Sequence, residues 1–303
     1  MKKLFKALAI IFVVLIVIAA GLGVAGHFVI VGLFGENGSV AKLGFSGYGD
    51  LLRTVNAVTA SPAKVDPAYA ASDENDQKLY DELSAHTYYS ALTKAALNSG
   101  EKIDVAGVDL TSLDDKEKMY VAFYGGISSQ SSPVTISGGM HAAGLAFLKE
   151  KGLLSTSSDF DFDVKGISVS DENNGARFIT LVLSVKKDDI LAAIPSDAGF
   201  VKDLISSFLH SELTASIKCQ CAFVNGAASV GEATVSLNSA SASDCRKIVD
   251  YVNETQDGAI DSLPSLIEEF INAPLYTREP ITGVAIRTAS ANFDGDGNIV
   301  YSK

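Results

Sequence analysis

The chain has no tryptophan, only three cysteines, and no cluster of basic residues beyond its first six positions. Three cysteines are too few for a disulfide framework in 303 residues, so buried apolar side chains must hold the fold together. Phosphate groups are bound through Lys and Arg, so the missing basic patch argues against nucleic acid as a partner. The same absence argues against electrostatic docking on anionic lipid headgroups.

Catalytic signatures are missing as well. Neither GxSxG nor HExxH occurs in the chain, so the sequence shows no nucleophile elbow and no zinc-protease helix. The stretch Gly21-Leu22-Gly23-Val24-Ala25-Gly26 matches the dinucleotide fingerprint GxGxxG. That motif binds pyrophosphate only inside a βαβ unit, and no such pattern surrounds it here. The sequence therefore predicts no catalytic residue, no cofactor and no metal site, and the chain is not expected to be an enzyme.

The chain instead contains a long uncharged run from Ala7 to Gly35. Three lysines precede the run within the first six residues, and Glu36 is the first acidic residue after it. About 20 apolar residues in a helix span a bilayer, and lysines mark the cytoplasmic side. We therefore expect a single-pass signal-anchor: a transmembrane helix in the cell membrane, with a cytoplasmic N-terminus and an extracytoplasmic domain at the cell envelope.

A cleaved signal peptide is the alternative interpretation of this run. Its small-residue cleavage site would be Val24-Ala25-Gly26. The apolar residues continue to Phe34, which is further than a signal peptide needs. The uncleaved anchor is therefore the preferred prediction.

The chain divides into three segments. Residues 1–35 hold the cytoplasmic lysines and the transmembrane anchor. Residues 36–118 combine a Gly- and Ser-rich juxtamembrane stalk with a helical pattern from Asp73 to Leu97. Residues 119–303 show regular apolar alternation and are expected to form an α+β extracytoplasmic domain.

Several strands can be identified from alternation with a period of two. Apolar and charged residues alternate from Phe160 to Val164, and the alternation resumes out of phase after Gly166. A bulge at Gly166 would return the apolar side chains to the inner face. Two long strands are predicted over 178–185 and 213–223, and Asn225-Gly226 predicts a hairpin turn to a third over 233–237. Short strands are predicted at 119–124 and 134–136, and a closing hairpin is predicted to join 284–291 to 299–301.

Helical patterns separate these strands. Ser137 is a suitable N-cap for a helix from Gly138 to Lys151, and Gly152 is a suitable stop. Further helical patterns cover 188–194, 197–209, 244–252 and 262–272. No βαβ rhythm connects the strands, so the predicted fold class is α+β. We expect an N-terminal transmembrane helix followed by a curled antiparallel sheet covered by helices.

This order of elements, from about Val134 to Lys303, resembles the tubular lipid-binding (TULIP-like) proteins, in particular bacterial single-pass membrane proteins. The shared features are an N-terminal anchor, a short helix before a strand pair, and a helical excursion before a long hairpin. The ending is also similar to the family's closing hairpin: Ile281-Thr282-Gly283-Val284-Ala285-Ile286 followed by Gly297-Asn298-Ile299-Val300-Tyr301. The resemblance implies an apolar groove that shields a lipid or another hydrophobic molecule.

The candidate groove combines the 138–148 helix with the inward faces of two strands, and Gly144 is expected to leave room beside it. If helix and sheet close completely, these residues are only a core, but if they stay apart the groove must hold an apolar ligand. The expected lining residues are Met140, Phe147, Leu148, Ile179, Leu181, Leu183, Val185, Ile217 and Phe223.

The cysteines allow three interpretations. Cys219 and Cys221 share one strand face, and Cys245 lies on the apolar face of a following helix. They can be plain core residues, they can form a disulfide from Cys245 to Cys219 or Cys221, or they can bind zinc together with His210. No CxxC or HxxxH spacing supports zinc.

The acidic stretch near the C-terminus resembles the start of a calcium-binding loop. It reads Asp294-Gly295-Asp296-Gly297-Asn298, and no glutamate follows at the twelfth loop position. A tight hairpin turn is therefore the preferred prediction.

The leading functional prediction is a membrane-anchored extracytoplasmic protein that binds a lipid or another hydrophobic ligand. A scaffold or receptor that binds another envelope protein is one alternative. An envelope hydrolase that uses Asp161, Asp163 or His141 is the other, although both aspartates fall on the polar face of their strand.

Overall fold

The computed structural model describes residues 48–86, 104–105, 108–109, 112–125, 132–153, 162–172, 174–192, 206, 209–255, 261, 263–278 and 284–303. The predicted anchor at 7–35 and all but a fragment of the predicted helix at 197–209 lie outside these residues. Within the described part of the chain, no helix is both long enough and apolar enough to cross a membrane. The fold is α+β with antiparallel sheets, as the sequence predicts.

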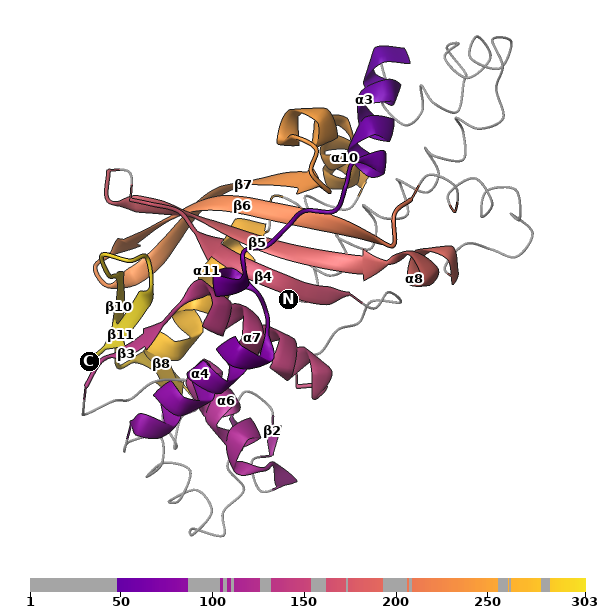
Figure 1. The fold of residues 1–303 in the computed structure, drawn as a ribbon. Helices are drawn as coiled ribbons and strands as arrows, with labels where there is room; N and C mark the ends of the chain where they lie inside the picture. Colours follow the sequence, from indigo (N-terminus) through magenta and orange to yellow (C-terminus); the bar gives the residue numbers. More distant parts are fainter. Residues whose placement is uncertain are drawn as a thin grey trace.

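The principal sheet has four antiparallel strands in the order β4-β5-β6-β7 (Figure 1). Asn225 and Gly226 make the tight turn between the last two strands, with φ angles of 52° and 73°. Both angles lie in the left-handed region, which a two-residue hairpin turn of type I′ requires. The strands are β4 (Asp163–Val169), β5 (Ala176–Lys186), β6 (Glu212–Val224) and β7 (Ala227–Leu237).

The predicted bulge in β4 is confirmed. The pairing of β4 with β5 shifts between Val164 and Gly166, so that Lys165 is the extra residue. A side chain at position 166 would also collide with the chain that crosses the sheet here, because its Cβ would lie 2.5 Å from the carbonyl oxygen of Tyr69. Glycine at this position thus serves both the bulge and the close approach.

The apolar side chains of the long strands gather on one face of the sheet, as the alternation predicts. Ile179 lies opposite Cys219, and Leu181 lies opposite Ile217. Because residues directly opposite in a ladder point to the same side, these four side chains share one face.

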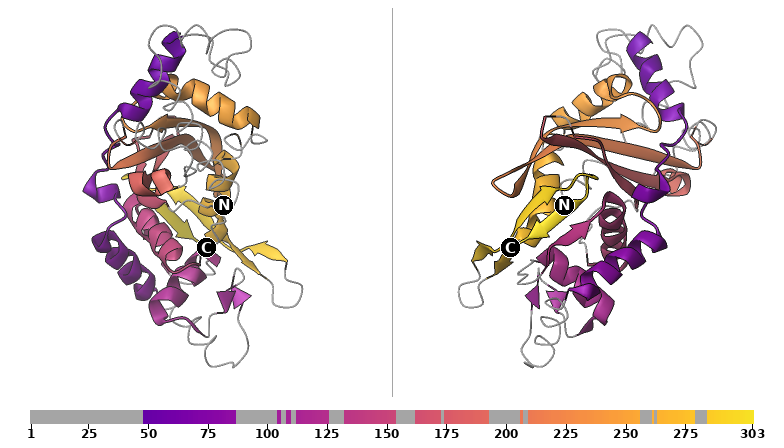
Figure 2. Two further views of the ribbon diagram at one scale, coloured as in Figure 1. Left: turned by 90° about the vertical axis from the view of Figure 1, so that its right-hand side faces the viewer. Right: turned by 60° about the vertical axis from the view of Figure 1, so that its left-hand side comes forward.

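The expectation of a curled sheet is wrong. The principal sheet is open and twisted, and the last strands of the chain form a separate small sheet instead of extending it (Figures 1 and 2). Helices cover its apolar face, so the sheet does not need to bend around its own side chains to bury them.

Two helices cover this apolar face, one at each edge strand of the sheet. Helix α7 (Gly138–Glu150) packs against β4, and α11 (Leu263–Asn272) packs against β7. Behind α7 lie α4 (Asp73–Ala85) and α6 (Asp115–Gly125). At the β7 side, α10 (Ala242–Thr255) packs with α3 (Tyr48–Thr59) (Figure 2).

Residues 60–71, which we call the crossing segment, run over the strands from β7 to β4 (Figure 1). Ser239 donates its backbone N–H to the carbonyl of Ser61, and Ala71 donates to that of Lys165. The 3-10 helix η2 (Pro67–Tyr69) lies within this segment. Part of the predicted 36–118 segment therefore packs on the principal sheet, while the predicted boundary at residue 118 stays a prediction.

A second sheet joins distant parts of the chain in the order β10-β11-β3. Its strands are β3 (Val134–Ile136), β10 (Ser290–Phe293) and β11 (Ile299–Ser302). The predicted closing hairpin is divided, because β9 (Ala285–Arg287) pairs instead with β8 (Tyr276–Arg278). The remaining elements are β1 (Asp104–Val105), β2 (Val108–Asp109), α8 (Lys187–Ala192) and η4 (Ala273–Leu275).

The predicted strand at 119–124 is wrong, since these residues belong to α6. Asp114 accepts the backbone N–H of Glu117 at 2.8 Å, and the Glu117 side chain accepts that of Asp114 at 2.9 Å. This reciprocal pair is a capping box, and the Asp-x-x-Glu spacing was visible in the sequence. Tyr120 and Phe123 are fully buried, so a short apolar run alone could not separate a strand from a core helix.

Candidate hydrophobic ligand site

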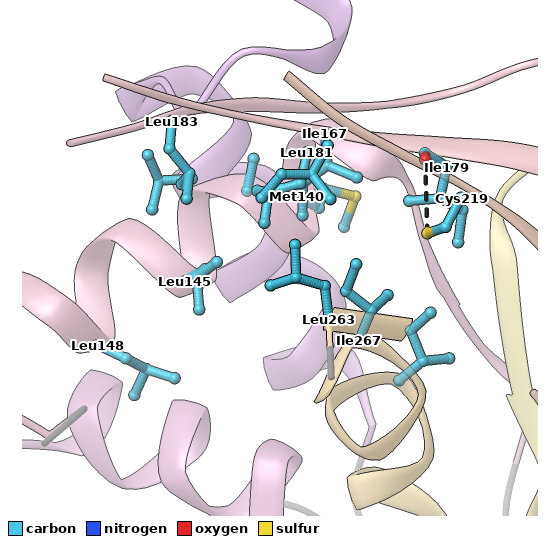
Figure 3. Close-up of a cluster of buried hydrophobic side chains, with 14 of the residues drawn as sticks. Met140, Leu145, Leu148, Ile167, Ile179, Leu181, Leu183, Cys219, Leu263 and Ile267 are labelled. Carbon is cyan, nitrogen blue, oxygen red and sulfur yellow. Dashed lines mark hydrogen bonds between the residues drawn. The ribbon is translucent and has the colours of Figure 1, made fainter. Parts of the chain in front are cut away.

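An apolar cavity lies between α7, α11 and the centre of the principal sheet (Figure 3). Its volume is about 60 Å³. Because α7 packs on β4 and α11 packs on β7, neither helix fills the space in front of β5. The lining residues are Gly138, His141, Leu145, Ile167, Val169, Ile179, Leu181, Leu183, Leu266, Ile267, Phe270, Ile271 and Ile299.

Three of the predicted groove residues line this cavity. Ile179, Leu181 and Leu183 occupy alternate positions on β5 and form its floor. Met140, Leu148, Val185 and Ile217 are buried core residues outside the lining set. The structure therefore brings the predicted β5 residues to the cavity and places these four neighbours in the surrounding core.

Phe147 and Phe223 are placed elsewhere. Phe147 stacks on Tyr120 of α6 with ring centroids 4.4 Å apart. Phe223 packs edge to face on Phe293 of β10, with centroids 4.8 Å apart. The structure therefore does not bring these two rings to the cavity, and each has an aromatic partner elsewhere.

A different side of α7 faces the cavity from the one that the sequence predicts. The residues that face the cavity are Gly138, His141 and Leu145, at i, i+3 and i+7. Gly144 faces the other way, since a Cβ there would lie 2.6 Å from the hydroxyl oxygen of Tyr124 and 2.8 Å from Leu79. This glycine permits close helix packing and leaves no room for a ligand.

Sequence reasoning missed the contribution of α11. Leu266, Ile267, Phe270 and Ile271 repeat at i, i+1, i+4 and i+5 and form the wall opposite α7. The helix itself was predicted over 262–272, and its strong amphipathic spacing was the available signal. Nothing in that spacing says which sheet face the helix covers.

His141 is the one titratable residue in the lining. Its side chain is only 4% exposed, and neither ring nitrogen has a hydrogen-bond partner among the described residues. The rings of Phe123, Phe270 and Tyr301 surround it, with centroids 6.0 to 6.1 Å away. Burial lowers the pKa of His141 to about 3, so the imidazole is neutral at pH 7.

All three cysteines are free and buried, so the disulfide from Cys245 to Cys219 or Cys221 is not formed in the structure. The Cys245 sulfur accepts the backbone N–H of Leu237 at 3.2 Å. Burial raises the pKa of Cys219 and Cys245 to about 11, and that of Cys221 to about 12. Thiols held in this protonated form are poor nucleophiles and poor metal ligands.

Among the described residues, no three or more His, Cys, Asp or Glu side chains lie close enough together to hold a metal ion. At the acidic turn, Asp294 accepts the backbone N–H groups of Asp296 and Asn298 with its own carboxylate. Arg177 donates to the carbonyl oxygens of Asp294 and Gly295 at 3.1 and 3.0 Å. The Asp294 carboxylate is therefore engaged within the turn itself, and the positively charged guanidinium of Arg177 lies against the turn backbone.

The residues named for the hydrolase alternative are not brought together. Asp163 lies within 3.7 Å of both Lys149 and Lys186, beside an open polar hollow of about 850 Å³. His141 is eight residues before Lys149 on α7, which corresponds to roughly 12 Å along the helix axis. Asp161 lies outside the described residues.

No protein-family model, no curated protein and no solved structure matches this chain. The resemblance to the tubular lipid-binding proteins therefore stays a prediction.

Proposed function

We propose that this protein binds a small hydrophobic molecule, or the apolar end of a lipid, in the cavity between α7, α11 and β5. The observation that carries the proposal is a void whose lining is carbon except at His141. The atoms that line an empty apolar void lack dispersion contacts on the side of the void. Cavities lined by Leu, Ile and Phe bind small apolar molecules. Each methylene group that enters contributes about 0.8 kcal/mol.

The size of the cavity limits what it holds. The volume of about 60 Å³ exceeds the roughly 10–15 Å³ that one water needs, and it is below the roughly 150 Å³ of a cavity that holds benzene. The cavity thus accommodates a few carbon atoms. A chain of about five carbons, such as pentane, exceeds this volume and requires α7 and α11 to separate. Their separation breaks no strand pairing, because the two helices pack on different strands.

The proposal does not include catalysis. His141 is enclosed by aromatic rings, and the carboxylate of Asp163 is held by two lysines at a separate place. An acid–base pair must lie within hydrogen-bond reach of one reacting group, and these two residues do not share one. A binding role accounts for the apolar lining without a reactive group.

Leu145→Phe is expected to abolish binding of a small apolar probe while the fold is retained. The Leu145 side chain borders the void, so a larger ring fills it. Pentane is the probe, added to the full-length protein, and the methyl resonances of Ile179, Leu181 and Ile267 report its arrival. We expect saturable shifts of these resonances in the wild-type protein, and at least tenfold weaker binding in the variant.

Leu79→Phe is the matched control. Leu79 is fully buried in α4 beside Gly144 and does not line the cavity, so the same enlargement overpacks the core. It should lower the free energy of unfolding by about 1–3 kcal/mol and leave pentane binding intact. Absence of saturable shifts in the wild type, or equal binding by Leu145→Phe, contradicts the proposed function.

We further propose that residues 7–35 anchor the protein in the cell membrane, with the described residues on the extracytoplasmic side. The support is the uncharged run and the three lysines before it. Protease added to intact cells or spheroplasts should then digest the C-terminal part of the chain. A C-terminus that stays protected until the membrane is permeabilised would show that the orientation is wrong.

A further inference from the structure

The cavity contains a polar group that hydrocarbon alone does not satisfy. His141 lines the void, and both of its ring nitrogens lack a hydrogen-bond partner among the described residues. More than nine-tenths of its surface is buried. Buried polar atoms in native proteins are nearly always paired, so this imidazole calls for a partner inside the cavity.

The chemistry of the imidazole defines that partner. A neutral imidazole offers one N–H donor and one nitrogen acceptor. A hydroxyl group can accept from the first or donate to the second, whereas a hydrocarbon can do neither. An ionised carboxylate or phosphate does not suit the site, because the other lining residues carry no charge and burial of an unpaired ion is very costly.

From this geometry we propose that the ligand is a neutral, hydroxyl-bearing hydrophobic molecule whose hydroxyl group pairs with His141. Its carbon chain lies against Leu181 and Leu183 of β5. This inference rests on the proposed function, and it specifies the class of ligand that the same cavity takes. An ordered water that satisfies His141 in every state is the competing account, since the cavity is large enough for one.

The test compares pentane with 1-pentanol in the full-length protein and in His141→Phe. Phenylalanine keeps an aromatic ring beside Phe123, Phe270 and Tyr301 but removes both nitrogens. For each protein we divide the affinity for 1-pentanol by the affinity for pentane. The cost of desolvating the hydroxyl group is the same for both proteins, so it cancels when the two ratios are compared. One buried hydrogen bond predicts that this ratio falls about tenfold in the variant.

A second readout uses the wild-type protein alone and does not depend on how the variant folds. The ¹⁵N shifts of the His141 ring should change on saturation with 1-pentanol and stay unchanged with pentane. Pentanoate at pH 7 should bind at least tenfold more weakly than 1-pentanol.

The outcomes separate the two proposals. If both probes bind, the affinity ratio is the same in the two proteins and the His141 shifts do not respond, then water serves His141 and this inference is wrong, while the proposed function stands. If neither probe binds the wild-type protein at the cavity methyl groups, the proposed function fails and this inference fails with it.

Discussion

Gly138→Ala is expected to lower the free energy of unfolding by about 3 kcal/mol, although alanine is the better helix former by about 1 kcal/mol. Gly138 is the first residue of α7, where the helix meets β4. A Cβ at this position would lie 2.2 Å from the carbonyl oxygen of Ile167 and 3.2 Å from its carbonyl carbon. These are backbone atoms of a paired strand, so they cannot rotate away as a flexible side chain can.

Gly49→Ala is the control for the intrinsic effect of alanine in a helix. Gly49 lies in the first turn of α3, and a Cβ there meets nothing within 4 Å. This variant should be neutral or more stable by up to about 1 kcal/mol. Urea denaturation of the full-length chain measures both variants. If Gly138→Ala proves as stable as Gly49→Ala, α7 does not approach β4 as closely as the structure shows.

The same contact links stability to the candidate site, because Gly138 also lines the cavity. A helix displaced from β4 would change the distance between α7 and the floor formed by β5. Pentane binding by Gly138→Ala should therefore change together with its stability.

Features that depend on neighbouring residues could be predicted from the sequence. Ser137 caps α7 by accepting the N–H of Met140 at 3.2 Å, and Gly152 ends the helix region with a φ angle of 68°. The alternation along 178–185 placed Ile179, Leu181 and Leu183 on one face. A strand has a period of two, so a single strand identifies its own inner face without knowledge of its partner.

Features that depend on tertiary contacts could not be predicted. The apolar positions of α7 cover most of the helix, with Ala142, Leu145 and Leu148 all buried. Such a pattern does not identify which stripe meets the sheet and which meets α4 and α6, and the cavity wall was therefore assigned to the wrong side. The pairing of β11 with β3 joins Tyr301 to Val134 across more than half the chain, and local sequence contains no signal for it.

The unpartnered state of His141 likewise follows only from the tertiary arrangement. In the sequence His141 is one of four histidines without a motif. It becomes distinctive because α6, α11 and β11 each place an aromatic ring beside it: Phe123, Phe270 and Tyr301. Burial among such rings disfavours the imidazolium and makes the fold sensitive to pH.

Acidification from pH 7 to pH 4.5 is expected to destabilise the wild-type protein by about 2–3 kcal/mol more than His141→Phe. The pKa of His141 is about 3 in the folded protein and about 6.5 in the unfolded chain. Between these values the unfolded state binds a proton that the folded state does not. Stability from this residue is therefore fully present above pH 6.5 and declines by about 1.4 kcal/mol per pH unit as the pH falls toward 3.

The measurement is the free energy of unfolding in urea at pH 7, 6, 5 and 4.5 for both proteins. Carboxylates and the other histidines titrate in both, so their contributions cancel in the difference between wild type and variant. The rings nearest to His141 belong to Phe123, Phe270 and Tyr301, which carry no charge in this pH range. A difference that stays constant from pH 7 to pH 4.5 would mean that the folded protein protonates His141 as readily as the unfolded chain. In that case the imidazole reaches water, and His141 is not buried among the aromatic rings as the structure shows.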